Sequence, residues 1–125
     1  MIKLVFCLRR KEGTTLEAFQ RYWHDKHGPL VRKHGEALRI RRYVQLHTRD
    51  TAMSASLREG RGSPEGYDGV AELWWDSIED LQDAFETPEG QAAGAELLED
   101  ERKFIDLSRS PLWIADERPV IDLDS

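Results

Sequence analysis

A second cysteine and a long apolar run are both missing from this sequence. Cys7, the only cysteine, cannot form an internal disulfide, and its apolar neighbours favour a role as a small buried hydrophobic residue. No segment approaches the roughly 18 apolar residues that a membrane-spanning helix requires. The apolar stretch at the N-terminus is too short for a signal peptide and lacks a cleavage site of small residues. We therefore expect a cytoplasmic protein that does not associate with membranes.

Basic residues are outnumbered by acidic ones. The 125 residues include 18 Lys and Arg against 24 Asp and Glu, which gives a formal net charge of −6. Nucleic acids and anionic membranes are bound mainly through Lys and Arg, so we expect neither as a partner. The length and a hydrophobic fraction of 39% fit a single globular domain over residues 1–125.

Sequence motifs for nucleotide and metal binding are also missing. There is no glycine-rich phosphate loop, no CxxC pair and no HExxH helix. His24 and His27 are three residues apart and could chelate a metal on a helix, but no clear carboxylate or cysteine ligand accompanies them. We therefore expect no metal and no cofactor, and cofactor-free acid–base chemistry is the leading enzymatic interpretation.

Apolar alternation and capping patterns predict two strand–helix–strand units in series. The predicted elements, in order, are a strand over 2–9, a helix from Thr14 that breaks or kinks at Gly28-Pro29 and fades near Leu38, a strand over 39–48, a strand from Val70 to Trp75, helices from Ser77 through Phe85 and over about 88–102, and a strand over 111–115. The intervening residues 49–68 have no clear period, although a short helix around 52–58 fits them.

This order of elements predicts an α+β, ferredoxin-like fold. The pattern β-α-β-β-α-β gives one four-stranded antiparallel sheet with the helices on one face. Apolar residues such as Val5, Cys7 and Trp74 or Trp75 occur on both sides of the strands, so the face without helices would be largely apolar. Such an uncovered face is unusual on a monomer, and we expect a second copy to cover it about a two-fold axis.

His27 is the leading candidate for chemistry. Leu16, Phe19, Trp23 and His27 are separated by three, four and four residues, so His27 continues the core-facing stripe of the first helix. An imidazole there can act as an acid or a base near neutrality. The competing interpretation is a structural histidine that bonds backbone carbonyls at the end of a helix.

The second predicted strand places Tyr43, Gln45 and His47 on one face. If that face turns toward the helices, His47 shares a cavity with His27, and if it turns away, His47 lies between two sheets. Glu72 interrupts the apolar run of the third strand, where a carboxylate is costly to bury unless it is paired. It either balances an arginine on a neighbouring strand or lines the site.

Several stretches of the sequence carry a family resemblance. They are Phe19–Trp23 with His27–Val31, Arg42–His47, Tyr67–Asp76 and Asp100–Asp106. With them the chain resembles the EthD family of the dimeric α/β-barrel superfamily over nearly its whole length. The resemblance implies a ferredoxin-like protomer, a dimer with facing sheets, and a site between the sheet and the helices of each protomer.

The resemblance also implies roles for single residues. The histidine of the family's His-Gly/Ala-Pro motif matches His27, its strand-two histidine matches His47, and its Asp-Gly…Glu signature matches Asp68 and Glu72. Oxidoreductase activity is often attached to the family, and relatives in polyketide pathways resemble dehydratases. Residues 49–66 look individual to this chain.

We therefore expect a cofactor-independent enzyme acting on a small hydrophobic or aromatic substrate. The reaction would be of the oxidoreductase, dehydratase or isomerase type. The expected catalytic residues are His27, His47 and Glu72, and the expected substrate contacts are Tyr22, Trp23, Tyr43, Gln45, Asp68 and Trp74. The alternatives are a non-catalytic small-molecule-binding accessory protein and a haem-binding protein with His27 as the axial ligand.

Overall fold

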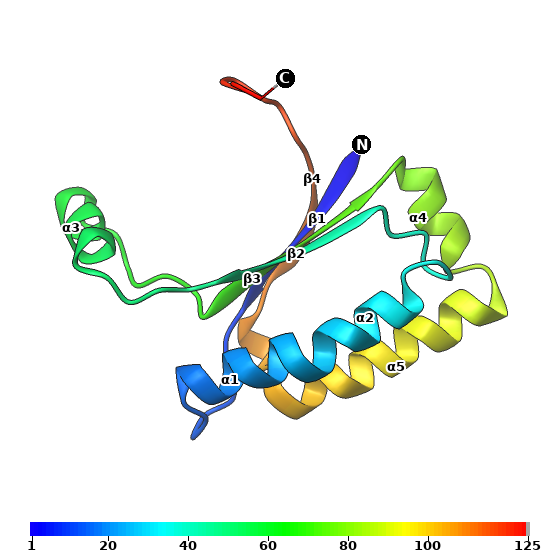
Figure 1. The fold of residues 1–125 in the computed structure, drawn as a ribbon, viewed down its shortest axis with the longest axis horizontal. Helices are drawn as coiled ribbons and strands as arrows, with labels where there is room; N and C mark the ends of the chain where they lie inside the picture. Colours follow the sequence, from blue (N-terminus) through cyan, green and yellow to red (C-terminus); the bar gives the residue numbers. More distant parts are fainter. Residues whose placement is uncertain (125) are drawn as a thin grey trace.

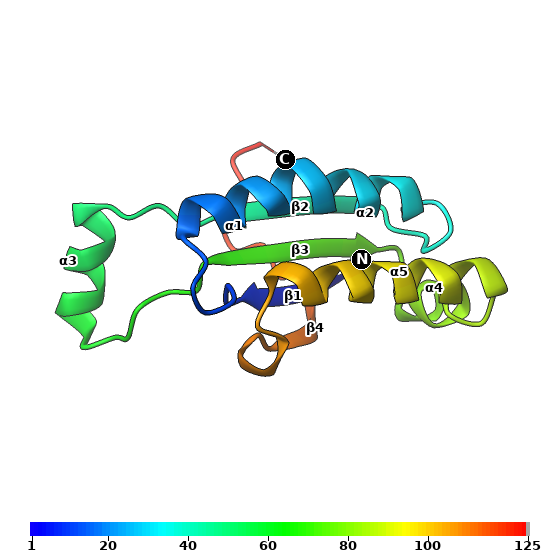
Figure 2. The same ribbon diagram turned by 90° about the horizontal axis from the view of Figure 1, so that it is seen from below.

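The strands form one sheet, and the helices of both strand–helix–strand units lie on the same side of it. The computed structural model describes residues 1–124, in which four antiparallel strands are ordered β2-β3-β1-β4. They are β1 (Ile2–Leu8), β2 (Arg42–His47), β3 (Gly69–Trp75) and β4 (Leu112–Asp116). Figures 1 and 2 show the long helices lying together against one face of this sheet. The α+β, ferredoxin-like prediction is confirmed.

The first helical segment continues through Gly28-Pro29 instead of breaking there. It consists of α1 (Leu16–Tyr22), a π-helical turn η1 (Trp23–His27) and α2 (Gly28–His34). The Thr15 side chain caps its start by accepting a hydrogen bond from the backbone N–H of Ala18. Proline suits the first turn of a helix because it needs no N–H donor there. The π turn over Trp23–His27 leads directly into α2, which begins at Gly28 with Pro29 in its first turn, so a local widening of the helix replaces the expected break.

The second helical segment has the two helices that the sequence predicts. In α4 (Ile78–Ala84), Ser77 accepts a bond from the backbone of Asp80, and in α5 (Pro88–Phe104), Thr87 accepts one from Gly90. The long helix α5 packs against η1 and α2. Figure 2 shows α5 lying alongside the α1–α2 segment across the sheet. A 3-10 turn η2 (Leu107–Arg109) then leads into β4.

The strand β2 begins three residues later than predicted. Arg39 has a φ of 58°, in the left-handed region, which turns the chain before it can enter the sheet. Strand alternation over 39–48 would put Ile40 on the same face as Val44. Because the strand begins only at Arg42, Ile40 instead faces the interior beneath the helices.

Strand register divides the sheet residues between two faces. Phe6 and Gln45 both pair with Ala71, and Phe6 and Ala71 pack against the helix residue Phe19, so these side chains point toward the helices. The opposite face carries Val5, Cys7, Val44, Leu46, Glu72, Trp74 and Trp113. This face therefore has the apolar character that the sequence predicted for it.

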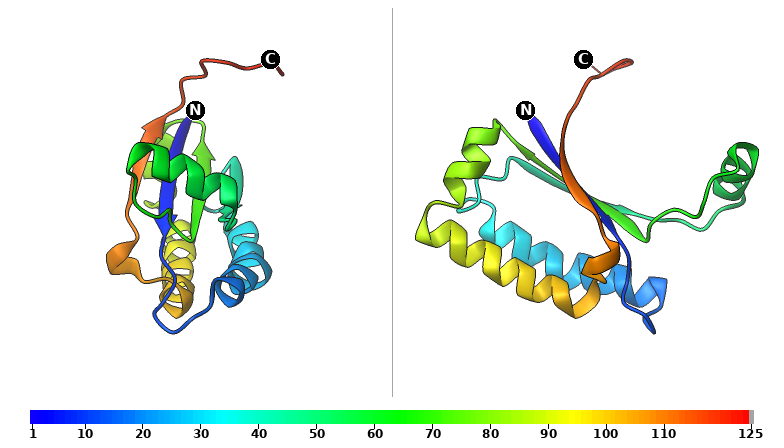
Figure 3. Two further views of the ribbon diagram at one scale, coloured as in Figure 1. Left: turned by 90° about the vertical axis from the view of Figure 1, so that its left-hand side faces the viewer. Right: turned by 180° about the vertical axis from the view of Figure 1, so that it is seen from behind.

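The segment between β2 and β3 projects away from the rest of the chain. Its helix α3 (Ala52–Arg61) is capped by Thr51 and ends at Gly62, whose φ of 62° suits a glycine. Figures 1 and 3 show α3 connected to β2 and β3 by two extended loop segments, far from the other helices. The short helix expected around 52–58 is present and runs to Arg61.

The expected burial of Cys7 is confirmed. The thiol is free and buried, and burial raises its pKa above the ordinary value despite the nearby positive charge of Arg9. Among residues 1–124, none of the helices combines the length and the apolar character needed to cross a bilayer.

Candidate functional site

Three polar side chains meet between the sheet and the helices. The Asp100 carboxylate on α5 accepts a hydrogen bond from His27 Nδ1 at 2.7 Å with one oxygen and from the Tyr22 hydroxyl at 2.6 Å with the other. An ionised carboxylate has no proton to give, so Nδ1 of His27 must carry the hydrogen. This fixes the tautomer and leaves Nε2 of His27 as an unprotonated acceptor.

Burial and the shared carboxylate set the protonation states of this group. Burial lowers the pKa of His27, and the bond to Asp100 only partly offsets that effect. Burial on its own would raise the pKa of Asp100, but the bonds from Tyr22 and His27 bring it below the ordinary value. The bond to Asp100 also raises the pKa of Tyr22 to about 12. A neutral imidazole next to an ionised Asp100 is therefore the resting state at neutral pH.

A second carboxylate lies on the other side of His27. Glu101 Oε2 is 3.9 Å from His27 Nε2, and its side chain is 20% exposed. Burial, together with the negative charge of Asp100, raises the pKa of Glu101 to about 7. The pair therefore combines a neutral base with a carboxyl group that gains or loses its proton near neutral pH, which suits acid–base chemistry.

Both groups open onto a large apolar cavity. Its volume is about 920 Å³, and it lies between the sheet and the helix layer. The polar residues in its lining are His27, Tyr43 and Glu101 toward one end of α5, and Gln82, Asp83 and Glu86 from the α4 segment. Most of the remaining lining is apolar, including Leu4, Phe6, Leu8, Trp23, Val31, Leu38, Leu73, Trp75, Leu97, Leu98 and Ile105. Such a lining favours a hydrophobic ligand with few polar groups.

Side chains of β2 buttress this cavity on one side. Gln45 Nε2 donates to the Tyr43 hydroxyl at 2.8 Å and to the Trp23 carbonyl at 2.9 Å. His47 bonds to Gln45 Oε1 at 2.8 Å, and its ring stacks on Trp23 with centroids 4.7 Å apart. Burial raises the pKa of Tyr43 to about 12, so its hydroxyl keeps its proton.

The β2 residues thus turn toward the helices, which answers the question that the sequence left open for His47. Of these three, Tyr43 lines the large cavity, while Gln45 and His47 line a neighbouring hollow of about 900 Å³. His47 is therefore on the same side of the sheet as His27, but it is linked to the cavity through Gln45 and Trp23.

The structure does not bring Glu72 and Trp74 to His27. Both lie on the opposite face of the sheet, where the Lys3 ammonium is 3.3 Å from the Glu72 carboxylate. Trp74 is flanked by Lys3 and Arg42, at 4.5 and 4.6 Å from its ring, and its indole N–H donates to Glu117. The partner that the sequence predicted for Glu72 is therefore a lysine and not an arginine. In this chain neither residue reaches the large cavity.

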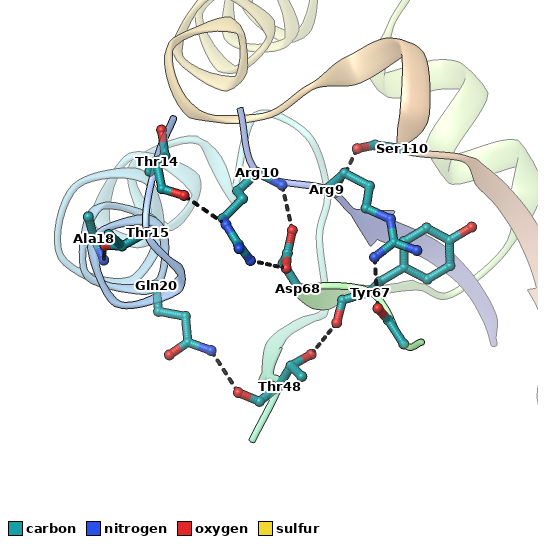
Figure 4. Close-up of polar contacts among 11 residues, drawn as sticks. Arg9, Arg10, Thr14, Thr15, Ala18, Gln20, Thr48, Tyr67, Asp68 and Ser110 are labelled. Carbon is teal, nitrogen blue, oxygen red and sulfur yellow. Dashed lines mark hydrogen bonds and ion pairs between the residues drawn. The ribbon is translucent and has the colours of Figure 1, made fainter. Parts of the chain in front are cut away.

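Asp68 lies at the base of the projecting α3 segment. Figure 4 shows its carboxylate bonded to Arg10, through the backbone N–H at 2.7 Å and the guanidinium at 2.6 Å. Nearby, Gln20 donates to the Thr48 carbonyl and Thr48 donates to the Tyr67 carbonyl. These bonds join the two ends of residues 48–67 to each other, to α1 and to Arg10, which follows β1. Asp68 therefore anchors this loop and is absent from the cavity lining.

Sequence reasoning did not assign roles to Asp100 and Glu101. The available signal was their spacing on α5, since they follow the buried Leu97 by three and four residues and so belong to its buried side. Acidic residues at such positions need partners. Among residues 1–124, no three His, Cys, Asp or Glu side chains are grouped closely enough to hold a metal ion.

Comparison with known proteins identifies relatives of this chain. The sequence profile of the EthD domain matches residues 11–108. A crystal structure of an EthD family protein from Bacillus halodurans C-125 is 25% identical, with a TM-score of 0.63, over 94% of this chain and 99% of that one. No curated protein sequence is significantly similar to the chain.

More distant structures share the fold. SnoaB from Streptomyces nogalater, a cofactor-independent oxygenase, is 13% identical, with a TM-score of 0.53, over 96% of this chain and 95% of that one. A dimeric ferredoxin-like protein of unknown function from Thermobifida fusca YX is 12% identical, with a TM-score of 0.53, over 91% of this chain and 88% of that one.

Proposed function

Because the chain belongs to the EthD domain family, we propose that it is a small-molecule enzyme that performs acid–base chemistry on a hydrophobic or aromatic substrate without a cofactor. The observation that carries this proposal is the setting of His27. Its imidazole is held by Asp100, kept neutral by burial, and directed at an apolar cavity of about 920 Å³.

His27 is the proposed general base and acid. Nε2 takes a proton from an activated C–H or O–H group of the substrate and later returns it. Asp100 positions the ring through Nδ1 and stabilises the imidazolium that forms, while Tyr22 holds Asp100 in place. Removing such a proton is a shared first step of isomerisation, dehydration and oxidation of an enolisable substrate. That the related fold of SnoaB serves a cofactor-independent oxygenase supports this class.

The remaining sequence candidates have supporting roles in this proposal. Trp23 and Tyr43 form part of the cavity wall and contact the substrate. Gln45 and His47 act as positioning residues, because Gln45 holds the Tyr43 hydroxyl and His47 holds Gln45. Glu72 and Trp74 belong to the opposite face of the sheet and are assigned to a dimer interface.

The proposal is tested with 2-tetralone, an apolar bicyclic ketone whose benzylic C–H bonds are easily ionised. Exchange of the hydrogens on the benzylic carbon next to the ketone for deuterium is followed by NMR in heavy water. We expect the protein to accelerate exchange over buffer and His27→Gln to lose about a hundredfold of that acceleration, because the base is gone. His24→Gln, a change at a histidine whose side chain is 74% exposed, should leave the rate unchanged. Equal rates for wild type and His27→Gln, with 2-tetralone still bound, would favour a non-catalytic binding protein.

The chain is further proposed to form a homodimer through the sheet face without helices. This face carries Val44, Leu46 and Trp113, and the side chains of Leu46 and Trp113 are about half exposed. Covering it with a second copy removes apolar surface from water. The protein of the same fold from Thermobifida fusca is dimeric, which supports a dimer here.

Leu46→Asp tests the dimer. A carboxylate at this position would lose its water in the interface, so we expect the dimer to dissociate to monomers at micromolar concentration. Light scattering after size-exclusion chromatography measures the mass. Ile78→Asp, at a similarly exposed residue on the helix side, should remain dimeric. A dimer that persists in Leu46→Asp would point to a different interface.

A further inference from the structure

We infer that the cavity seats a hydroxyl or enol oxygen of an otherwise apolar ligand between His27 and Glu101. This inference rests on the proposed function and specifies its substrate class. It concerns the end of the cavity where η1 and α5 meet, and it gives Glu101 a direct role in binding the ligand.

The distance between the two side chains fits one shared oxygen atom. His27 Nε2 and Glu101 Oε2 are 3.9 Å apart, too far for a direct hydrogen bond. Two atoms at this separation can both lie about 2.8 Å from a single oxygen placed beside the line that joins them. A ligand hydroxyl in this position would bond to both side chains at ordinary length.

The donors and acceptors also match a hydroxyl group. Because His27 uses its Nδ1 hydrogen for Asp100, Nε2 can only accept, and it takes the hydrogen of the ligand. Glu101 in its protonated form donates to the same ligand oxygen. A hydroxyl or enol both donates and accepts, whereas an ether or a ketone leaves Nε2 without a donor.

The carboxyl group of Glu101 is available to a ligand. Among the described residues 1–124, no hydrogen bond reaches its carboxyl oxygens, and its side chain is 20% exposed. A carboxyl group in such a setting loses hydration, and a ligand hydroxyl would restore a hydrogen bond. Phe104 flanks His27 with ring centroids 5.2 Å apart, so the surroundings of the pair are apolar.

The size of the cavity indicates the rest of the ligand. Helix α5 and its cap line the cavity from Gly94 to Ile105, a span of eleven residues or about 16 Å at the helical rise. Along this span the neighbouring lining is largely apolar, with Leu97, Leu98 and Trp75. A fused-ring aromatic compound with one phenolic or enolic hydroxyl at its end fits both the long apolar wall and the polar pair.

Two probes of nearly equal shape test this inference. 2-Naphthol carries a hydroxyl where 2-methylnaphthalene carries a methyl group, and calorimetry or equilibrium dialysis at about pH 6 gives both dissociation constants. We expect wild type to bind 2-naphthol roughly tenfold more tightly, because two hydrogen bonds are gained. Glu101→Leu should lose much of this preference, because only the hydrogen bond to His27 remains, and Glu101→Gln, which keeps an N–H donor, should restore most of it.

Glu99→Leu is the matched control, since Glu99 is an exposed residue on the same helix, and it should keep the wild-type preference. Equal binding of the two probes by wild type, or a preference in Glu101→Leu as large as that of wild type, would overturn the hydroxyl seat and leave the proposed enzyme intact. Binding of neither probe would overturn the proposed function of the cavity and the seat together. The probes therefore separate the two failures.

Discussion

Replacing Asp100 by alanine is expected to lower the free energy of unfolding by about 4 kcal/mol, because its carboxylate accepts from both Tyr22 and His27. The substitution leaves the Tyr22 hydroxyl and the His27 Nδ1 hydrogen without an acceptor, and His27 is only 4% exposed. The unpaired N–H of buried His27 carries a full desolvation penalty and the hydroxyl of half-buried Tyr22 a smaller one, and the charge-assisted bonds are lost as well. Urea denaturation at neutral pH measures the change.

Asp100→Asn separates charge from hydrogen bonding at the same position. The amide oxygen can still accept from His27, so we expect a smaller loss of stability than in the alanine variant. Without the negative charge, the pKa of His27 should fall further, and NMR titration of the ring reports it. Glu99→Ala on the exposed side of α5 is the control. If Asp100→Ala is as stable as wild type, the hydrogen bonds among Tyr22, His27 and Asp100 do not contribute to the free energy of unfolding.

Much of the fold was predictable because its signals are local. Strand alternation in β1 and β3, the capping residue Ser77 and the proline at position 88 each act within a few residues, and the structure places all of these elements as predicted. The start of β2 was missed because it depends on Arg39, a non-glycine residue in the left-handed region. Nothing in the residue type announces that conformation.

The candidate site was only partly predictable. The helical stripe that ends at His27 correctly placed this histidine at the inner face, since that requires only the helical period. Asp100 and Glu101 come from a helix more than 70 residues away, and their meeting with His27 depends on how α5 packs against η1. Single-sequence periodicity carries no information about that packing.

The faces of the sheet illustrate the same limit. Alternation correctly grouped Tyr43, Gln45 and His47, but it could not say which group faces the helices. The register of β3 against β1 then puts Glu72 and Trp74 on the other side. Val44 pairs with Glu72, so these two side chains share one face of the sheet, and His47 lies on the other face. His47 and Glu72 therefore cannot both lie next to His27.

Glu101→Gln is expected to stabilise the protein in alkaline solution. Burial raises the pKa of Glu101 from 4.5 to about 7, so between these values the folded state holds a proton that the unfolded state has released. The contribution of Glu101 to stability is therefore complete below pH 4.5 and is lost as the pH rises through 7. A shift of this size corresponds to about 3 kcal/mol, which glutamine does not lose because it cannot ionise.

The measurement compares the free energies of unfolding of Glu101→Gln and wild type from about pH 4.5 to about pH 8. The difference between the two proteins should grow in favour of the variant by up to about 3 kcal/mol across this range. The groups that face Glu101 are His27, Tyr43 and Asp100, and they titrate in both proteins, so their own contributions largely cancel. A difference that stays constant with pH would show that Glu101 keeps its ordinary pKa. His27 would then face a carboxylate that is already ionised at neutral pH, and the hydrogen bond from Glu101 to a ligand oxygen would lose its donor.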